Sequence, residues 1–214
     1  MENGTILLTA ASLGFMHTVF GPDHYIPFVA LAKARSWSGT RTAAVTLLCG
    51  LGHVLSSVAI GFAGIALGTA LSRLQWVEAV RGDIAGWLLL LFGLGYMLWG
   101  IARARRGAHQ HAHGHTHGHA EGAVTPWAIF IIFVFGPCEP LIPVLVYPAI
   151  KDGIWTALAA AGVFSAVTIA TMLASVFLLL RGVSLLPAER MERYAHALAG
   201  FALFACGVAV KAGL

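Results

Sequence analysis

The sequence predicts an all-α, polytopic membrane protein whose six transmembrane helices form two inverted three-helix repeats, with helices 1 and 4 broken. Composition is the first reason, because 58% of the 214 residues are hydrophobic and only 10% are charged. The second is that six apolar stretches can span a hydrocarbon core, which takes about 20 helical residues. The third is a repeat: Val-Phe-Gly-Pro occurs at residues 19–22 and again at 134–137.

The six spans fall at roughly 5–31, 42–71, 83–101, 125–150, 153–180 and 194–211. We expect the first span to stay in the mature protein, because Glu2 stands where a cleavable signal carries basic residues. Residues 1–102 then form the first three-helix repeat, 103–124 a histidine-rich loop, and 125–214 the second repeat. Three crossings per repeat invert the second repeat relative to the first, as in many secondary transporters.

Each copy of the repeated tetrapeptide contains a helix-breaking pair, Gly21-Pro22 in the first span and Gly136-Pro137 in the fourth. Proline has no N–H group, so it leaves a carbonyl one turn earlier without its helical partner. Such a carbonyl is tolerated in a membrane only where it faces protein, water or a ligand. We therefore expect a substrate site near the midplane, where the two broken helices meet.

The basic residues are distributed unevenly over the loops. Nine of the thirteen lie in the first, third and fifth loops: Lys33, Arg35, Arg41, Arg103, Arg105, Arg106, Arg181, Arg190 and Arg193. The positive-inside rule places these loops in the cytoplasm and both termini outside, in a multi-pass protein of the cell (inner) membrane. The net charge of +4 follows from this asymmetry and gives no indication of nucleic-acid binding.

Ionisable side chains inside the spans gather near the two breaks. They are His17, Asp23, His24, His53, Cys138 and Glu139. We read Asp23 and Glu139 as the only carboxylates within the spans, where each costs ~2.5–3.5 kcal/mol on insertion scales. Imidazole, carboxylate and thiol together suit nickel, cobalt, zinc or copper, whereas magnesium and calcium prefer oxygen ligands. These residues are the predicted metal site; the alternative for any single histidine is a hydrogen bond to a neighbouring helix.

The third loop carries a second metal-binding signal. Histidine alternates there with small or polar residues, at His109, His111, His113, His115, His117 and His119. Such a segment is too polar to form a core, and its imidazoles can chelate transition metals. The alternative is a solvated linker of biased composition. We expect the loop to buffer, sense or hand over metal in the cytoplasm, with a metallochaperone or a second copy of the chain as candidate partners.

These motifs resemble a known family. His17, then five residues, then Asp23-His24, with Leu51-Gly52-His53 and the histidine-rich loop, resembles the NicO group of nickel/cobalt permeases and their urease-accessory-like relatives. The resemblance implies that His17, Asp23, His24 and His53 select and pass the metal. The first motif is one residue longer than in those permeases, and Gly136-Pro137-Cys138-Glu139-Pro140 replaces their further acidic motif.

The Pro137-Cys138 pair also resembles, more distantly, the thiol–disulfide conduits of the cytochrome-maturation type in the LysE superfamily. Those proteins need a cysteine in each half, and Asp23 stands at the position equivalent to Cys138. An exporter of a small anion or organic solute is another alternative. A fourth is a membrane metalloenzyme, with zinc on His17, His24 and His53 and its water activated by Glu139.

The hypothesis taken from the sequence is a non-enzymatic transporter of a divalent metal ion, with nickel and cobalt ahead of zinc and copper. His17, Asp23, His24, His53, Glu139 and Cys138 would hold the ion in the lipid bilayer, without a prosthetic group.

Overall fold

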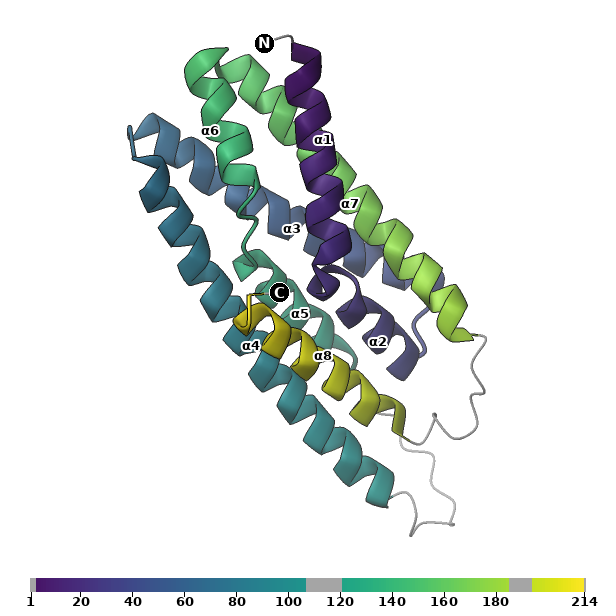
Figure 1. Ribbon diagram of the computed structural model, residues 1–214. Helices are drawn as coiled ribbons and strands as arrows, with labels where there is room; N and C mark the ends of the chain where they lie inside the picture. Colours follow the sequence, from purple (N-terminus) through teal and green to yellow (C-terminus); the bar gives the residue numbers. More distant parts are fainter. Residues whose placement is uncertain (1–2, 107–120, 185–193, 214) are drawn as a thin grey trace.

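The computed structural model describes residues 3–106, 121–184 and 194–213. The first half contains α1 (Asn3–Phe20), the short 3-10 helix η1 (Pro22–His24), α2 (Ile26–Ala34), α3 (Gly39–Ala66) and α4 (Leu71–Arg106). The second half contains α5 (Glu121–Phe135), α6 (Leu141–Lys151), α7 (Ile154–Ser184) and α8 (Ala195–Lys211). Every regular element in the described ranges is a helix, so the all-α class is confirmed (Figure 1).

Three of these helices, α3, α4 and α7, are long and apolar enough to cross a membrane. The pair formed by α1 and residues Pro22–Ala34 passes the same test as one span that bends by 84°. Three shorter apolar helices complete the set: Pro126–Phe135 within α5, then α6 and α8. The chain is therefore a multi-pass membrane protein, whereas the six-span inverted repeat, its orientation and its domain boundaries stay predictions.

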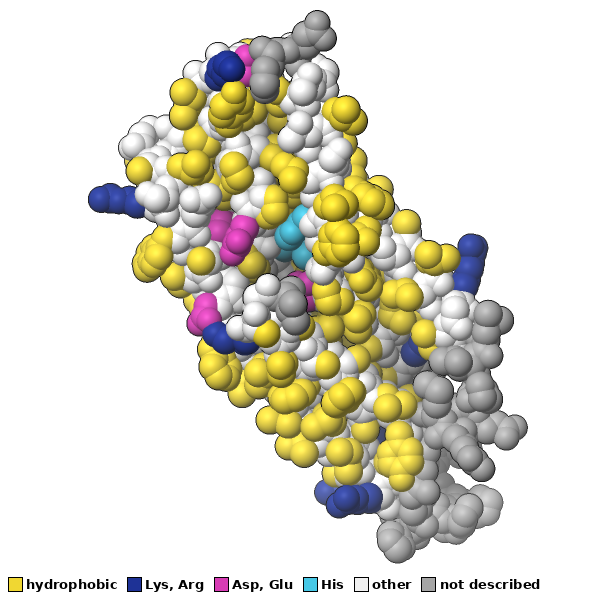
Figure 2. Space-filling view, viewed as in Figure 1, with side chains coloured by type: hydrophobic (Ala, Val, Ile, Leu, Met, Phe, Trp, Pro, Cys, Tyr) yellow, Lys and Arg dark blue, Asp and Glu magenta, His cyan; other side chains and the backbone are white. Residues whose placement is uncertain are grey.

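The outer surface is apolar, as contact with lipid tails requires. Hydrophobic side chains cover most of the face shown in Figure 2. Large ones are widely exposed on several helices, with Leu8 69%, Phe20 69% and Trp155 81% accessible. A water-soluble protein rarely exposes contiguous apolar area on this scale, so the surface agrees with burial in a bilayer.

The two halves share one order of elements, a broken helix followed by two continuous helices, and they pack across each other. In Figure 1 α1 lies along α7, while its counterpart α5 lies against α3, and α4 runs beside α8. Small residues allow the close approach that membrane helices need: a Cβ on Gly14 of α1 would lie 2.9 Å from the Phe164 carbonyl of α7.

The breaks occur at the repeated tetrapeptide, where the prolines predicted them. In the first, the Gly21 N–H still donates to the His17 carbonyl at 3.1 Å before the chain turns through η1. In the second, the Gly136 N–H donates to the Phe133 carbonyl at 3.0 Å, and residues 136–140 leave the helix before α6 begins at Leu141. Each break therefore contains a short segment that is not α-helical, as the sequence predicted.

The main departure from prediction is the start of α4. The third span was predicted from residue 83, but the helix begins at Leu71 and continues through Glu78 and Arg81. Glu78 is completely buried and forms an ion pair with Arg81 one helical turn later. The interpretation that Asp23 and Glu139 are the only carboxylates within the spans was therefore wrong, because the opposite charges of Glu78 and Arg81 satisfy each other inside an otherwise apolar helix.

Candidate metal centre

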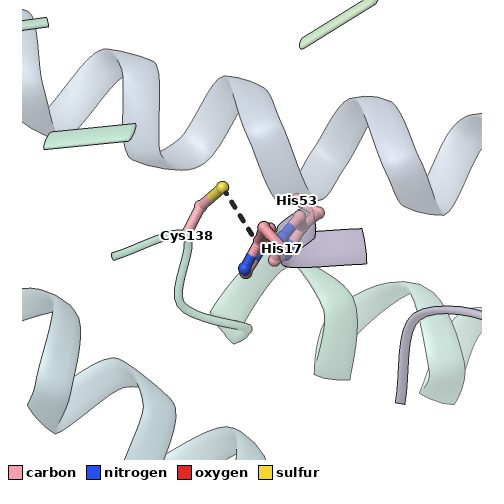
Figure 3. Close-up of side chains that lie close together, drawn as sticks. All are labelled: His17, His53 and Cys138. Atoms are coloured by element: carbon pink, nitrogen blue, oxygen red, sulfur yellow. Dashed lines mark hydrogen bonds between the residues drawn. The ribbon is translucent and has the colours of Figure 1, made fainter. Parts of the chain in front are cut away.

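Three potential metal ligands come together from three separate elements. His17 lies on α1, His53 on α3, and Cys138 in the break between α5 and α6 (Figure 3). One ligand atom from each lies within 4.8 Å of the other two, and the Cys138 Sγ is 3.6 Å from the His17 Nε2. His53 and Cys138 are buried, and His17 is half-buried. The arrangement presents two imidazoles and one thiol to a common point.

His24 adjoins this trio through its ring. Its Nε2 lies 3.3 Å from the His53 Nε2, and its ring centre lies 4.6 Å from that of His17. Its Nδ1 lies near two acceptors, the Gly21 carbonyl at 3.1 Å and the Asp23 carboxylate at 3.2 Å. A proton on Nδ1 can be donated to either acceptor, and the neutral tautomer that carries this proton keeps its lone pair on Nε2. This is how a second partner prepares a histidine for metal binding.

The glycine of each tetrapeptide makes room for one of these rings. A Cβ on Gly21 would lie 2.5 Å from the His24 Nδ1, and one on Gly136 would lie 3.0 Å from the His53 Nδ1. The repeat therefore does more than break two helices. In each half its glycine lets an imidazole pack directly over the break.

A small cavity of about 30 Å³ adjoins the ring of His53. Its polar wall includes Asp23 and His24, and the break at Gly136-Pro137 borders it. α4, α5 and α8 supply the apolar wall, with Ala85, Gly86, Leu89, Ile132, Phe133 and Val210. A space of this size is large enough for at least one water molecule or for a small ion.

A buried network behind Cys138 was not predicted from the sequence. Glu78 accepts hydrogen bonds from the Cys138 backbone N–H and from the Ser57 hydroxyl, both at 2.9 Å. Arg81 pairs with Glu78 and donates to the Val134 carbonyl at 2.7 Å. Removing one partner of a buried ion pair typically costs about 3–5 kcal/mol, so these charges are strongly interdependent. The available signal was the Glu-x-x-Arg spacing directly before an apolar run.

The predicted site residues separate into three groups. His17, His53 and Cys138 form the trio, with His24 against it; Asp23 contacts His24 and lies outside the trio. Glu139 is exposed, because the non-helical chain turns it away from the neighbouring buried Cys138. The structure thus leaves Glu139 out of the cluster to which the sequence assigned it. The six loop histidines, His109 to His119, lie outside the described residues.

Figure 2 shows histidine side chains at the bottom of a hollow in one face of the molecule, with acidic side chains nearby.

Comparison with known families corrects the resemblance taken from the sequence. Residues 23–209 match the model of a family described as cytochrome c biogenesis protein transmembrane region. Comparisons with curated proteins and with solved structures find no match. The resemblance to nickel/cobalt permeases of the NicO group was wrong: its motifs were a few short polar patterns, whereas this match spans both halves. The chain belongs to the family of cytochrome c biogenesis protein transmembrane regions.

Proposed function

We propose that this chain carries a transition-metal ion across the membrane through the site formed by His17, His53 and Cys138. The observation that carries the proposal is that these three donors come from three elements and both halves, yet lie within 4.8 Å of one another. Ionisable groups inside membrane proteins are costly and usually mark a pathway or a relay. Two nitrogens and one sulfur around a point form the donor set of a transition-metal site.

The chemistry of the donor atoms also indicates which metal ions the site would prefer. A buried thiol joins the histidines, while the Glu139 carboxylate points away from them. Thiolate is a soft ligand that favours copper(I) and zinc, and imidazole suits zinc, copper and nickel. We therefore expect zinc and copper(I) to bind at least as well as nickel and cobalt, and magnesium and calcium to bind poorly.

The two breaks supply a route by which the ion can move. His17 and His24 flank the first break, and Cys138 lies in the second. Movement of one half-helix would therefore separate the donors and release the ion. The cavity of about 30 Å³ beside His53 would accept the ion on one side of the site. Because metal ligands must be deprotonated, protons entering the site would promote release.

The family favours a second candidate, a thiol–disulfide relay. Cys138 follows Gly136-Pro137 at the second break, and the His17 Nε2 lies 3.6 Å from its sulfur. A relay by disulfide exchange requires a second thiol. The equivalent position in the first break holds Asp23, and Cys49 and Cys206 pack in a different hydrophobic cluster from Cys138. Cys138 therefore has no second thiol beside it, and for this reason we rank the relay after metal transport.

Proteoliposomes distinguish the two candidates. The purified chain would be reconstituted with a metal-sensitive dye inside, and zinc influx compared for wild type, Cys138→Ser and His53→Gln, with Cys49→Ala as the matched cysteine control. The metal proposal expects influx in wild type and Cys49→Ala and its loss in the other two. Absence of metal flux, together with a disulfide that contains Cys138 after mild oxidation, would replace it with the relay.

A further inference from the structure

The buried Glu78–Arg81 pair contacts the second break at several points. Arg81 Nη2 donates to the Val134 carbonyl at 2.7 Å and to the Gly136 carbonyl at 3.3 Å. Pro140 cannot donate to the Gly136 carbonyl, so Arg81 replaces the hydrogen bond that an intact helix would have made. The arginine of α4 thus satisfies backbone groups that the break exposes.

The carboxylate of Glu78 binds the backbone of Cys138 directly. Glu78 Oε2 accepts from the Cys138 N–H at 2.9 Å, and the Cys138 side chain then extends to 3.6 Å from the His17 Nε2. A backbone amide bound to a carboxylate that is completely buried has little freedom to rotate. Holding this amide restrains the backbone from which the Cα–Cβ bond of Cys138 projects, and the sulfur then lies within reach of His17.

The helix that carries His53 joins the same network. Ser57 donates to Glu78 at 2.9 Å and accepts from Arg81 at 3.0 Å, and Ser56 accepts from Arg81 at 2.6 Å. Ser56 also donates to the His53 carbonyl at 2.8 Å. The network therefore connects the segment that carries Cys138 to the helical turn that follows His53.

We infer that Glu78 and Arg81 are positioning residues that aim the Cys138 sulfur at the metal site. The inference rests on the proposed function, because it assigns a role relative to a metal held by Cys138. Partners outside the ligand set typically contribute ~10–100-fold to metal affinity. We name this set, Glu78, Arg81 and Ser57, the clamp.

Cobalt(II) is the probe that reports the role of the clamp. A thiolate bound to cobalt gives a charge-transfer absorption band in the near ultraviolet, and histidines give none, so the full chain with its loop can be used. Arg81→Gln, Glu78→Gln and the milder Ser57→Ala would be titrated with cobalt. The matched control is Asp83→Asn, which removes an acid of the same helix that pairs with Lys211 on α8.

We expect Arg81→Gln and Glu78→Gln to lower cobalt affinity ~10–100-fold and to lose band intensity per bound cobalt, with Ser57→Ala intermediate. Asp83→Asn should match wild type. Intensity is normalised to monodisperse helical protein, so a loss of folded material does not imitate the effect. If Arg81→Gln or Glu78→Gln is not recovered folded, Ser57→Ala decides the question.

Wild-type affinity and wild-type band intensity in the folded clamp variants would overturn the inference and leave the metal site standing. A wild-type chain that binds cobalt without any thiolate band would instead remove Cys138 from the ligands. That result would overturn the proposed site and the inference together, so the two failures are distinguishable.

Discussion

The Cys138 sulfur lies 3.6 Å from the His17 Nε2, although 121 residues separate them in the chain. One belongs to the break of the second half and the other to the helix that enters the break of the first. Their contact joins the halves at the point where both helices are interrupted. It makes Cys138 the residue whose replacement tests the site most simply.

Replacing Cys138 with serine should weaken zinc binding by at least ~10-fold, because the soft thiolate is lost while the size of the side chain is kept. Calorimetry on the purified chain measures the change. Cys49→Ala removes an equally buried thiol outside the trio and should bind zinc as wild type does. Equal affinity in wild type and Cys138→Ser would contradict the assignment.

The pH dependence should identify the same residue. A thiol must release its proton to bind metal, so zinc affinity should rise ~10-fold per pH unit for each proton released. We expect wild type to release about one proton more than Cys138→Ser on binding zinc. Calorimetry in buffers of different ionisation enthalpy counts these protons, and identical counts for the two chains would show that the thiol does not take part.

Asp23→Asn tests whether Asp23 acts through His24. Asp23 contacts the His24 Nδ1 at 3.2 Å and lies outside the trio, so the variant should lose metal affinity only ~10-fold. Zinc flux should slow without stopping. This replaces the expectation from sequence that Asp23 is itself a ligand. Complete loss of binding in this variant, with its folding intact, would restore Asp23 to the ligand set.

Gly136→Ala should displace the ring of His53, because a side chain is added to the backbone against which that ring packs. The new Cβ would lie 3.0 Å from the His53 Nδ1 and 3.1 Å from the Phe133 carbonyl, so the ring must move. We expect a ~10-fold or greater loss of zinc affinity, as for other changes in the support of a ligand. Gly95→Ala is the control, because its Cβ would meet nothing within 4 Å.

In the Gly95 control, alanine should leave zinc affinity unchanged and raise helix stability by up to ~1 kcal/mol. Thermal unfolding followed by circular dichroism checks this. A Gly136→Ala chain with the affinity of the control would mean that the ring of His53 is not held as described.

The six loop histidines, His109 to His119, should bind additional metal ions and should not be ligands of the membrane site. Replacing all six with alanine is expected to lower the number of zinc ions bound per chain, because the imidazoles of a histidine-rich tract chelate metal. The thiolate-to-cobalt band should keep its full intensity. Loss of that band on replacing only the loop histidines would show that the loop completes the site.

Much of the fold follows directly from the sequence, for physical reasons. Pro22 and Pro137 cannot continue a helical hydrogen-bond pattern, and the chain breaks at both. Continuous apolar stretches gave the long helices α3 and α7, with ends within about five residues of those predicted.

The site was predicted less completely, because spacing along a helix does not apply across a break. Cys138 and Glu139 are adjacent in sequence, yet one is buried at the site and the other is exposed. Hydropathy likewise treats Glu78 and Arg81 as two separate unfavourable charges, so the predicted third span began after them, at residue 83. Only folding shows that the two charges pair with each other and with the break.

X-ray absorption at the zinc edge tests the central claim most directly. The sample is the zinc-loaded chain with all six loop histidines replaced by alanine, so that the membrane site dominates the signal. We predict one sulfur at about 2.3 Å and two or three nitrogens at about 2.0–2.1 Å, with the sulfur lost in Cys138→Ser. A shell of nitrogen and oxygen alone, or no retained zinc, would contradict a metal site at His17, His53 and Cys138.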